Sequence, residues 1–422
     1  MKTQPNAKIF LETAHSKRKL KMDGKGAAKR YPVPAPGLDV ALVVGVLGLA
    51  GMGLVMVYSA STEWALKMCG SETYYIKRQA IYFVAGLFAF YLGYRIPFRA
   101  YRNLAYPLLA LSAFLLILVH VPHIGHTAGG ATRWIKIGFI TFQPSEFARI
   151  ALVIYYAYSM EKKKEVMGNF WVGIVPHILV TLFLCGLLMT QPDFGSSVLL
   201  VAVGGLMLYV GGARTSTLVF MGVSAFILGA SAIMGSEYRS ERFLAFLNPW
   251  LYEDNEGYQI CHSLMAFGTG GIGGAGLGGS LQKLLYLPEP HTDFIFSILG
   301  EELGLWGVCL VVALYGVVLW RGIVIARKTR SMFGAYLAIG LTAGIGLQAF
   351  VNMGVSMSLL PAKGLTLPFL SYGGSSLFLN MAVVGMLNNI SARRRPKRKT
   401  EPVDVRIPIA PIGRSPWPRP AA

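Results

Sequence analysis

The sequence predicts an all-α integral membrane protein, a bundle of about ten transmembrane helices. Three observations support this class. Of the 422 residues, 54% are hydrophobic and only 14% are charged, whereas soluble proteins carry about 25% charged residues. Uncharged apolar runs recur along the chain, and several reach the roughly 20 residues that a helix needs to cross a bilayer. The net charge of +19 is concentrated between these runs.

The apolar runs are expected to form helices in order along the chain. The first extends from Val40 to Tyr58 after about 37 polar and basic residues, which favours an uncleaved anchor over a cleavable signal peptide. The division of 196–234 into two spans depends on Gly211–Arg214 alone. The later spans are expected at 80–94, 104–121, 147–160, 171–190, 196–213, 215–234, 294–320, 333–353 and 375–390.

The basic residues set the expected orientation, because Lys and Arg are enriched in cytoplasmic loops. With ten spans and a cytoplasmic N-terminus, 29 of the 39 Lys and Arg residues fall on the cytoplasmic side. Both termini are therefore expected in the cytoplasm, and the positive charge needs no nucleic-acid partner. We expect a basic disordered tail over 1–37, a ten-helix membrane domain over 38–391 and a basic, Pro-rich tail over 392–422.

Three expected extracytoplasmic segments are longer than the other connections: 122–146, about 235–293 and 354–374. The second is the largest and lies between the seventh and eighth expected helices. Long loops on one face of a compact bundle commonly carry functional residues. We therefore place the chemistry on the extracytoplasmic face.

The glycine run Gly268–Gly279 contains the pattern G-x-G-x-x-G. A dinucleotide site needs a strand before this pattern and a helix after it, and neither is predicted here. A tightly turned loop at the membrane surface is favoured, with close backbone approach to a headgroup as an alternative. No nucleotide or organic cofactor is expected.

Charged residues next to the apolar runs are candidates for function, because they are costly at membrane depth. Glu146 and Arg149 are three residues apart and share one helix face. They could form a local ion pair or line a charged cavity, and both interpretations stay open. For Asp193, which precedes an apolar run, helix capping is the larger expected role.

Asp293 lies where the largest loop meets the next span, close in sequence to Glu289 and His291. It could cap the helix, as could Thr292. A carboxylate beside several cations also suits a substrate with hydroxyls and phosphates, since the carboxylate could accept a proton and the cations could hold a diphosphate. The cations in the same loop are Arg239, Arg242 and Lys283. Glu301 and Glu302, eight and nine residues after Asp293, are expected to have a structural, supporting role.

The four cysteines have no metal-binding spacing. Cys185 and Cys309 lie in apolar runs and are expected to act as small apolar residues. Cys69 and Cys261 are expected on the extracytoplasmic side, where either a disulfide or two free thiols would fit.

Five motifs together resemble the SEDS family (shape, elongation, division, sporulation), and the resemblance extends over residues 40–390. Division-type members (FtsW) are more similar than elongation-type members (RodA) at Lys363–Pro368, at Gly300 and at Gln282–Leu284. A sporulation paralogue would look similar. The motifs are Gln143–Glu146, Pro192–Gly195, Leu287–Phe296, Gly300–Gly304 and Ser371–Ser376.

The resemblance implies a peptidoglycan glycosyltransferase that polymerises lipid II into β-1,4 glycan, releases polyprenyl diphosphate and inverts the anomeric carbon. It implies Asp293 as the catalytic carboxylate. The family has Lys where this chain has Arg149, and Arg suits diphosphate binding better than proton transfer. The expected substrate-binding residues are Glu146, Arg149, Arg239, Arg242, Lys283, Lys363 and Ser371, and the supporting residues are Asp193, His291, Glu301 and Glu302.

The resemblance also implies partners and a location. The chain is expected in the bacterial inner membrane at the division septum, with its active site outside the cytoplasm. Its partners would be lipid II, polyprenyl-linked glycan, a class B penicillin-binding protein (an FtsI-type transpeptidase) and other division proteins. A divalent cation, Mg²⁺ or Mn²⁺, is a candidate cofactor with Asp293 as a candidate ligand. A lipid II flippase and a non-catalytic scaffold of the divisome are the alternatives.

Overall fold

The computed structural model describes residues 37–128, 131–138, 140–235, 241, 244–255, 257–284, 286–361 and 364–392. Apart from their residues next to the bundle, the two expected tails lie outside this part of the chain. Three of the expected substrate-binding cations do so as well: Arg239, Arg242 and Lys363.

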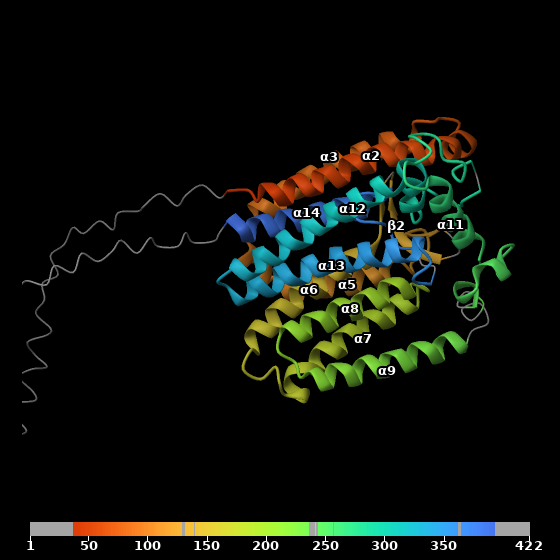
Figure 1. Cartoon of the computed structure of the whole chain (residues 1–422). Coiled ribbons are helices and arrows are strands. Elements are labelled where there is room, and N and C mark those ends of the chain that lie inside the picture. Colours follow the sequence, from red (N-terminus) through yellow and green to blue (C-terminus); the bar gives the residue numbers. More distant parts are fainter. Residues whose placement is uncertain are drawn as a thin grey trace, which may run out of the picture. The chain divides into compact units, whose positions relative to one another are not determined.

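Each predicted apolar run coincides with a helix in the structure (Figure 1). The run over 196–234 is divided at Gly211–Arg214, between α8 and α9, as expected. A π-helix at Phe170–Ile174 leads into α7, and a 3₁₀ turn occupies Pro249–Tyr252. The α-helices are α2 (Val40–Cys69), α3 (Tyr74–Arg95), α4 (Phe98–Asn103), α5 (Ala105–Leu118), α6 (Pro144–Lys162), α7 (Val175–Met189), α8 (Phe194–Val210), α9 (Thr215–Met234), α11 (Tyr258–Gly270), α12 (Ile295–Lys328), α13 (Met332–Ser356) and α14 (Gly374–Ala392).

Four helical stretches among the described residues are long and apolar enough to cross a membrane: Val40–Cys69, Phe170–Met189, Ile295–Lys328 and Met332–Ser356. Shorter apolar helices occur as well, among them Ala105–Leu118 and Phe194–Val210. These helices indicate a multi-pass membrane protein. The count of ten spans and the orientation of the termini stay predictions.

The segment 122–146 was expected as a loop, and here the all-α prediction is wrong. It contains a three-stranded antiparallel sheet in the order β1 (Gly125–Ala128), β2 (Ala131–Ile137) and β3 (Ile140–Phe142). Thr, Trp and Ile in this segment favour strands, but the strands are too short to stand out beside long apolar runs. Arg133 in β2 donates hydrogen bonds to the carbonyl oxygens of Gln191 (3.3 Å) and Pro192 (2.6 Å), which attaches the sheet to the turn between α7 and α8.

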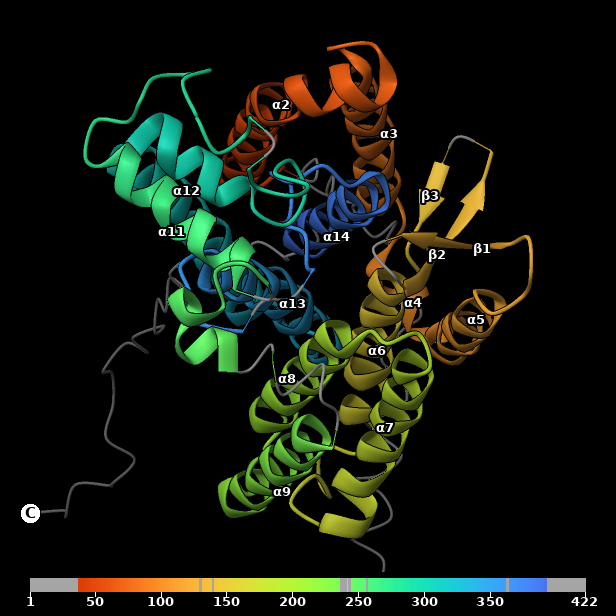
Figure 2. The ribbon, with the colours of Figure 1, turned by 90° about the vertical axis from the view of Figure 1, so that its right-hand side faces the viewer.

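The bundle is packed around α13 and α14 (Figure 2). α14 packs along α3, α12 packs against α2 and α13, and α6 packs against α5 and α13. Glycine permits close packing of α3 and α14, because a Cβ at Gly93 would overlap the carbonyl oxygen of Ala382 in α14. The start of α2 and the end of α14 lie at one end of the bundle, and the sheet and α11 lie at the other (Figure 1).

An ion pair holds the end of the bundle where α2 starts. Arg321 in α12 donates to both carboxylate oxygens of Asp39, at 2.9 and 2.7 Å. Asp39 also accepts a hydrogen bond from the backbone N–H of Leu42, and its own N–H donates to Asn388 in α14. Asp39 thus joins α2, α12 and α14 at this end.

Replacing Arg321 by alanine is expected to destabilise the protein by roughly 1.5–3 kcal/mol, because it leaves the buried Asp39 carboxylate without its charged partner. The thermal unfolding midpoint of the purified protein checks this. Arg327→Ala, at an exposed position of the same helix, is the control and should change the midpoint little. Equal midpoints for the two variants would contradict the expectation.

Candidate active site

The backbone that carries Asp293 is fixed by the connection between α13 and α14. The N–H of Tyr372 donates to the carbonyl oxygen of His291 at 2.9 Å. The hydroxyl of Ser371 donates to the carbonyl oxygen of Thr292 at 2.6 Å. Two hydrogen bonds therefore join the segment Ser371–Tyr372 to the segment His291–Thr292, just before α12 begins. The Ser371 hydroxyl, an expected substrate contact, is used inside the protein here.

The Asp293 carboxyl group is partly buried, and its proton affinity is unusual. Its pKa is raised to about 7 mainly by burial and also by the negative charge of Glu289, while the positive charge of Arg133 acts in the opposite direction. No side chain caps α12, whose N-cap position is Phe294, so the alternative in which Asp293 or Thr292 caps this helix is wrong. A carboxyl group with a pKa near neutral pH suits proton transfer.

His291 supports this segment through its aromatic neighbours. Its ring centroid lies 4.3 Å from that of Tyr75 and 5.5 Å from that of Tyr372. Burial lowers the pKa of the His291 ring to about 4, so the ring is neutral at neutral pH. A neutral, enclosed imidazole contributes packing rather than positive charge.

Glu146 and Arg149 line a small cavity between α6, α8 and α13. Arg149 is 4% exposed and donates hydrogen bonds to the amide oxygens of Gln348 and, at 3.3 Å, Asn380. Among the described residues, Arg149 thus pairs with amide oxygens rather than with Glu146, whose Oε2 is buried without a partner. These contacts favour the cavity-wall interpretation over a local ion pair.

The cavity and Asp293 share one wall, the segment Gly364–Thr366. All three of its residues line the cavity. The backbone at Gly364 also lies so close to Asp293 that a Cβ there would be 2.9 Å from Asp293 Oδ2. Gly364 therefore lies both in the lining of the cavity of Arg149 and next to the carboxylate of Asp293.

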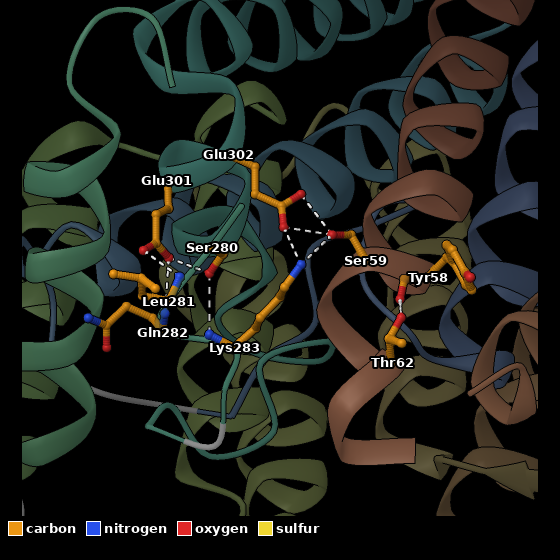
Figure 3. A network of polar contacts seen from close by, with 9 residues as sticks. All are labelled: Tyr58, Ser59, Thr62, Ser280, Leu281, Gln282, Lys283, Glu301 and Glu302. Atoms are coloured by element: carbon orange, nitrogen blue, oxygen red, sulfur yellow. Dashed lines mark hydrogen bonds and ion pairs between the residues drawn. The ribbon is translucent and has the colours of Figure 1, made fainter. Parts of the chain in front are cut away.

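Lys283, an expected substrate-binding residue, forms a buried ion pair with Glu302 (Figure 3). Its Nζ lies 2.9 Å from Glu302 Oε1 and donates to Ser59 Oγ in α2 at 3.1 Å. Lys283 is 7% exposed and Glu302 is 1% exposed. In this conformation the Lys283 charge is paired within the protein rather than open to a substrate.

Glu301 holds the loop before Lys283 (Figure 3). Its carboxylate accepts hydrogen bonds from the backbone N–H groups of Leu281, at 3.0 Å, and Gln282, at 3.4 Å. The hydroxyl of Ser280 donates to the same carboxylate. Glu301 and Glu302 thus fasten opposite sides of one loop.

The glycine run completes a break in α12. Gly304 has φ +62°, and the helix is interrupted there. The N–H groups of Ala275 and Gly276 donate to the carbonyl oxygens of Glu301 (2.9 Å) and Glu302 (3.0 Å). The run begins in the last turn of α11 and continues as a tight loop. A helix rather than a strand precedes the glycine pattern, so the context of a dinucleotide site is missing. The backbone of the run lies close to that of α12.

The other predicted residues have clear places. Asp193 Oδ1 accepts a hydrogen bond from the N–H of Ser196 at 3.1 Å, so Asp193 caps α8 as predicted. Cys69 is an exposed free thiol and Cys261 a buried one, so these two cysteines form no disulfide here.

Gln348, Asn352 and Asn380 are site residues that the sequence analysis missed. Gln348 and Asn352 are four residues apart and share one face of the apolar helix α13. Asn380 lies in the apolar helix α14. Their polar amides inside apolar runs could have indicated them from the sequence, because a polar side chain is costly at membrane depth, as a charge is.

The chain is similar to known proteins along most of its length. A family model described as "Cell cycle protein", which covers FtsW, RodA and SpoVE, matches residues 40–396. The chain is 44% identical over 357 residues to the probable peptidoglycan glycosyltransferase FtsW of Geobacter metallireducens, with 85% of this chain and 95% of that protein covered.

Two solved structures are similar as well. One belongs to work on the "structural coordination of polymerization and crosslinking by a peptidoglycan synthase complex"; it has a TM-score of 0.71 at 28% identity and covers 85% of this chain and 98% of that one. The rod shape determining protein RodA of Thermus thermophilus has a TM-score of 0.64 at 28% identity, with the same two shares covered.

Replacing Lys283 by alanine is expected to lower the thermal unfolding midpoint strongly, because the buried Glu302 carboxylate loses its counter-charge; such losses cost about 3–5 kcal/mol. The double variant Lys283→Met with Glu302→Gln removes both charges and should recover most of the midpoint. A double variant as unstable as Lys283→Ala would show that the ion pair is not the reason for the loss.

Proposed function

The chain belongs to the cell cycle protein family that includes FtsW, RodA and SpoVE, and from this membership we propose that it is a peptidoglycan glycosyltransferase. It polymerises lipid II into β-1,4 glycan strands during cell division and releases polyprenyl diphosphate. The observation that carries the proposal is Asp293, a partly buried carboxyl group with a pKa near 7. It lies across one wall from a cavity that contains a buried arginine.

The reaction needs a base for the attacking hydroxyl. The 4-hydroxyl of the acceptor N-acetylglucosamine attacks the anomeric carbon of the donor, and the bond from that carbon to the diphosphate oxygen breaks. Asp293 takes the proton of the hydroxyl, and the electron pair of the broken bond leaves with the diphosphate. One displacement converts the α-linked diphosphate into a β-linkage, so the transfer inverts the anomeric carbon.

The leaving diphosphate gains negative charge, which nearby cations must offset. Arg149 is suited to this task because its guanidinium lies in the cavity that shares a wall with Asp293. Arg133 acts electrostatically on Asp293 and lies on the sheet. Other cations proposed for this role lie outside the described residues: Arg239, Arg242 and Lys363.

A divalent cation, Mg²⁺ or Mn²⁺, is part of the proposal. The described residues contain no group of three or more His, Cys, Asp or Glu that could hold a metal ion. Mg²⁺ is, however, commonly held by one or two carboxylates together with substrate phosphates. The partly buried carboxylate of Asp293 fits that arrangement, and the cation would add positive charge at the diphosphate.

The proposed setting is the bacterial cytoplasmic membrane at the division septum. We propose ten spans, cytoplasmic termini and an active site on the outer face; the position of the α2 start and the α14 end opposite the sheet and α11 supports this (Figure 1). A class B penicillin-binding protein is the proposed partner, together with other division proteins. The similarity to a chain of a peptidoglycan synthase complex supports such a partner.

Two alternative functions, a lipid II flippase and a non-catalytic scaffold, are supported less well by this structure than the glycosyltransferase. A lipid II flippase would need a polar path through the bundle, and a scaffold would need no base. A carboxyl group with a pKa near 7 is suited to the proton transfer that the glycosyltransferase needs, which favours the enzyme.

Replacing Asp293 by asparagine is expected to reduce glycan formation by a factor of about 10² or more, because the base is lost while the shape of the side chain is kept. The measurement is polymerisation of lipid II by the purified protein with its penicillin-binding partner. Asp254→Asn, at an exposed position of the same loop, is the matched control and should polymerise normally.

Polymerisation at the normal rate by Asp293→Asn would remove the residue from the mechanism and favour the scaffold. Transfer of lipid II across vesicle membranes without glycan formation, by the unaltered chain, would favour the flippase.

The value of kcat/KM is expected to rise with pH and to level off above about pH 7, because only the ionised Asp293 accepts a proton. Glu289→Gln removes a negative charge that raises the pKa of Asp293, so the midpoint should move to lower pH. A pH profile of initial polymerisation rates measures both. A flat profile near neutral pH, or a midpoint that moves upward in Glu289→Gln, would contradict the expectation.

A further inference from the structure

Two amide side chains of α13 hold the wall between Asp293 and the cavity. Gln348 Nε2 donates to the carbonyl oxygen of Thr366 at 2.9 Å and to its hydroxyl at 3.3 Å. Four residues later, Asn352 Nδ2 donates to the carbonyl oxygen of Leu365 at 2.6 Å. One face of α13 therefore fixes two consecutive peptide groups of the Gly364–Thr366 segment.

Asn352 also holds the backbone of Asp293. The same Nδ2 donates to the carbonyl oxygen of Asp293 at 2.8 Å. Asn352 is 1% exposed, so its amide lies away from water, where an unmade hydrogen bond is costly. With the bonds from Tyr372 and Ser371, each of the carbonyl groups of residues 291–293 is then held by a donor. The Asn352 bond is the one that reaches Asp293 itself.

Gln348 connects this arrangement to the cation in the cavity. Its Oε1 accepts a hydrogen bond from Arg149, while its Nε2 holds Thr366. The hydroxyl of Thr366 in turn donates to Ser376 Oγ at 3.1 Å. A continuous series of hydrogen bonds thus extends from Arg149 through Gln348 and the wall to Asn352.

Gly364 determines how close the wall comes to the carboxylate. A Cβ at this position would lie 2.9 Å from Asp293 Oδ2 and 3.8 Å from its Cγ, and among the described residues, its chain neighbours apart, no other atom would lie within 4 Å. Contacts below 3.0 Å require a shift, and the atom that can shift here is the end of the Asp293 side chain. The distance between wall and carboxylate is therefore set by the absence of a side chain at Gly364.

We propose that Asn352 is a positioning residue that, by holding Asp293 and the Gly364–Thr366 wall together, fixes the Asp293 carboxylate relative to the cavity of Arg149. The inference rests on the proposed glycosyltransferase function and adds a residue to it. Asn352 does not contact the substrate. It acts through the backbone of Asp293 and through the wall.

Two variants test this by different routes, with lipid II as substrate. Asn352→Leu keeps approximately the volume but removes both donors. Gly364→Ala removes no hydrogen bond and only pushes the carboxylate. Both are expected to lower kcat by about 10- to 100-fold, since a misplacement of about 1 Å has effects of this size. KM should stay within about threefold, because the groups that hold the diphosphate are unchanged.

The control for the glycine variant is Gly268→Ala, on an exposed face of α11 where a Cβ meets nothing within 4 Å. It should leave kcat and KM unchanged. Rates are expressed per folded protein, measured by gel filtration, so that a loss of folded material does not count as a loss of kcat. A purely structural role of Asn352 would lower the amount of folded protein and leave kcat per folded molecule unchanged.

Normal kcat in Gly364→Ala, or a raised KM with normal kcat in Asn352→Leu, would overturn the inference while leaving the proposed function intact. If the unaltered chain and Gly268→Ala both form no glycan, the proposed function itself fails, and the inference fails with it. The result on the unaltered chain therefore separates the two failures.

Discussion

A buried charge in an apolar bundle is costly without a partner, and the pairing of several such charges connects helices at both ends of this structure. The buried Asp39 is paired with Arg321, and Lys283 is paired with Glu302. The guanidinium of Arg149 is satisfied by amide oxygens rather than by a carboxylate. Each unpaired charge would cost several kcal/mol, so each pair fixes the helices that carry it. Asp293 differs, because it lies at the edge of the bundle and its carboxyl group can hold or release a proton near neutral pH.

The site is built from pieces that are distant in the sequence. α6 supplies Arg149, α13 supplies Gln348 and Asn352, and the loop before α12 supplies Asp293. Amides suit the positions between charges because one amide accepts from a cation and donates to a carbonyl group at the same time. This gives a rigid connection without adding another charge to an apolar environment. Rigid placement of a base is what the proposed inverting transfer requires.

Much of the fold could be predicted because long apolar runs dominate the sequence, and each run coincides with a helix. The sheet was missed because strands as short as Ile140–Phe142 leave a weak pattern. The location of Asp293 at the edge of the largest loop was predicted, but its support by Tyr372 was not, since pairing across the sequence leaves no local signal. The positions of the charged residues in the sequence likewise could not show that Lys283 forms an ion pair with Glu302.

The break at Gly304 gives the loop between α11 and α12 a fixed length. Ala275 and Gly276 supply the hydrogen bonds that the carbonyl groups of Glu301 and Glu302 would otherwise find in their own helix. An inserted or deleted residue between Gly271 and Lys283 would move these donors out of register. In related chains, variation in loop length is therefore expected outside this stretch, and a change within it should be accompanied by a continuous helix at the position of Gly304.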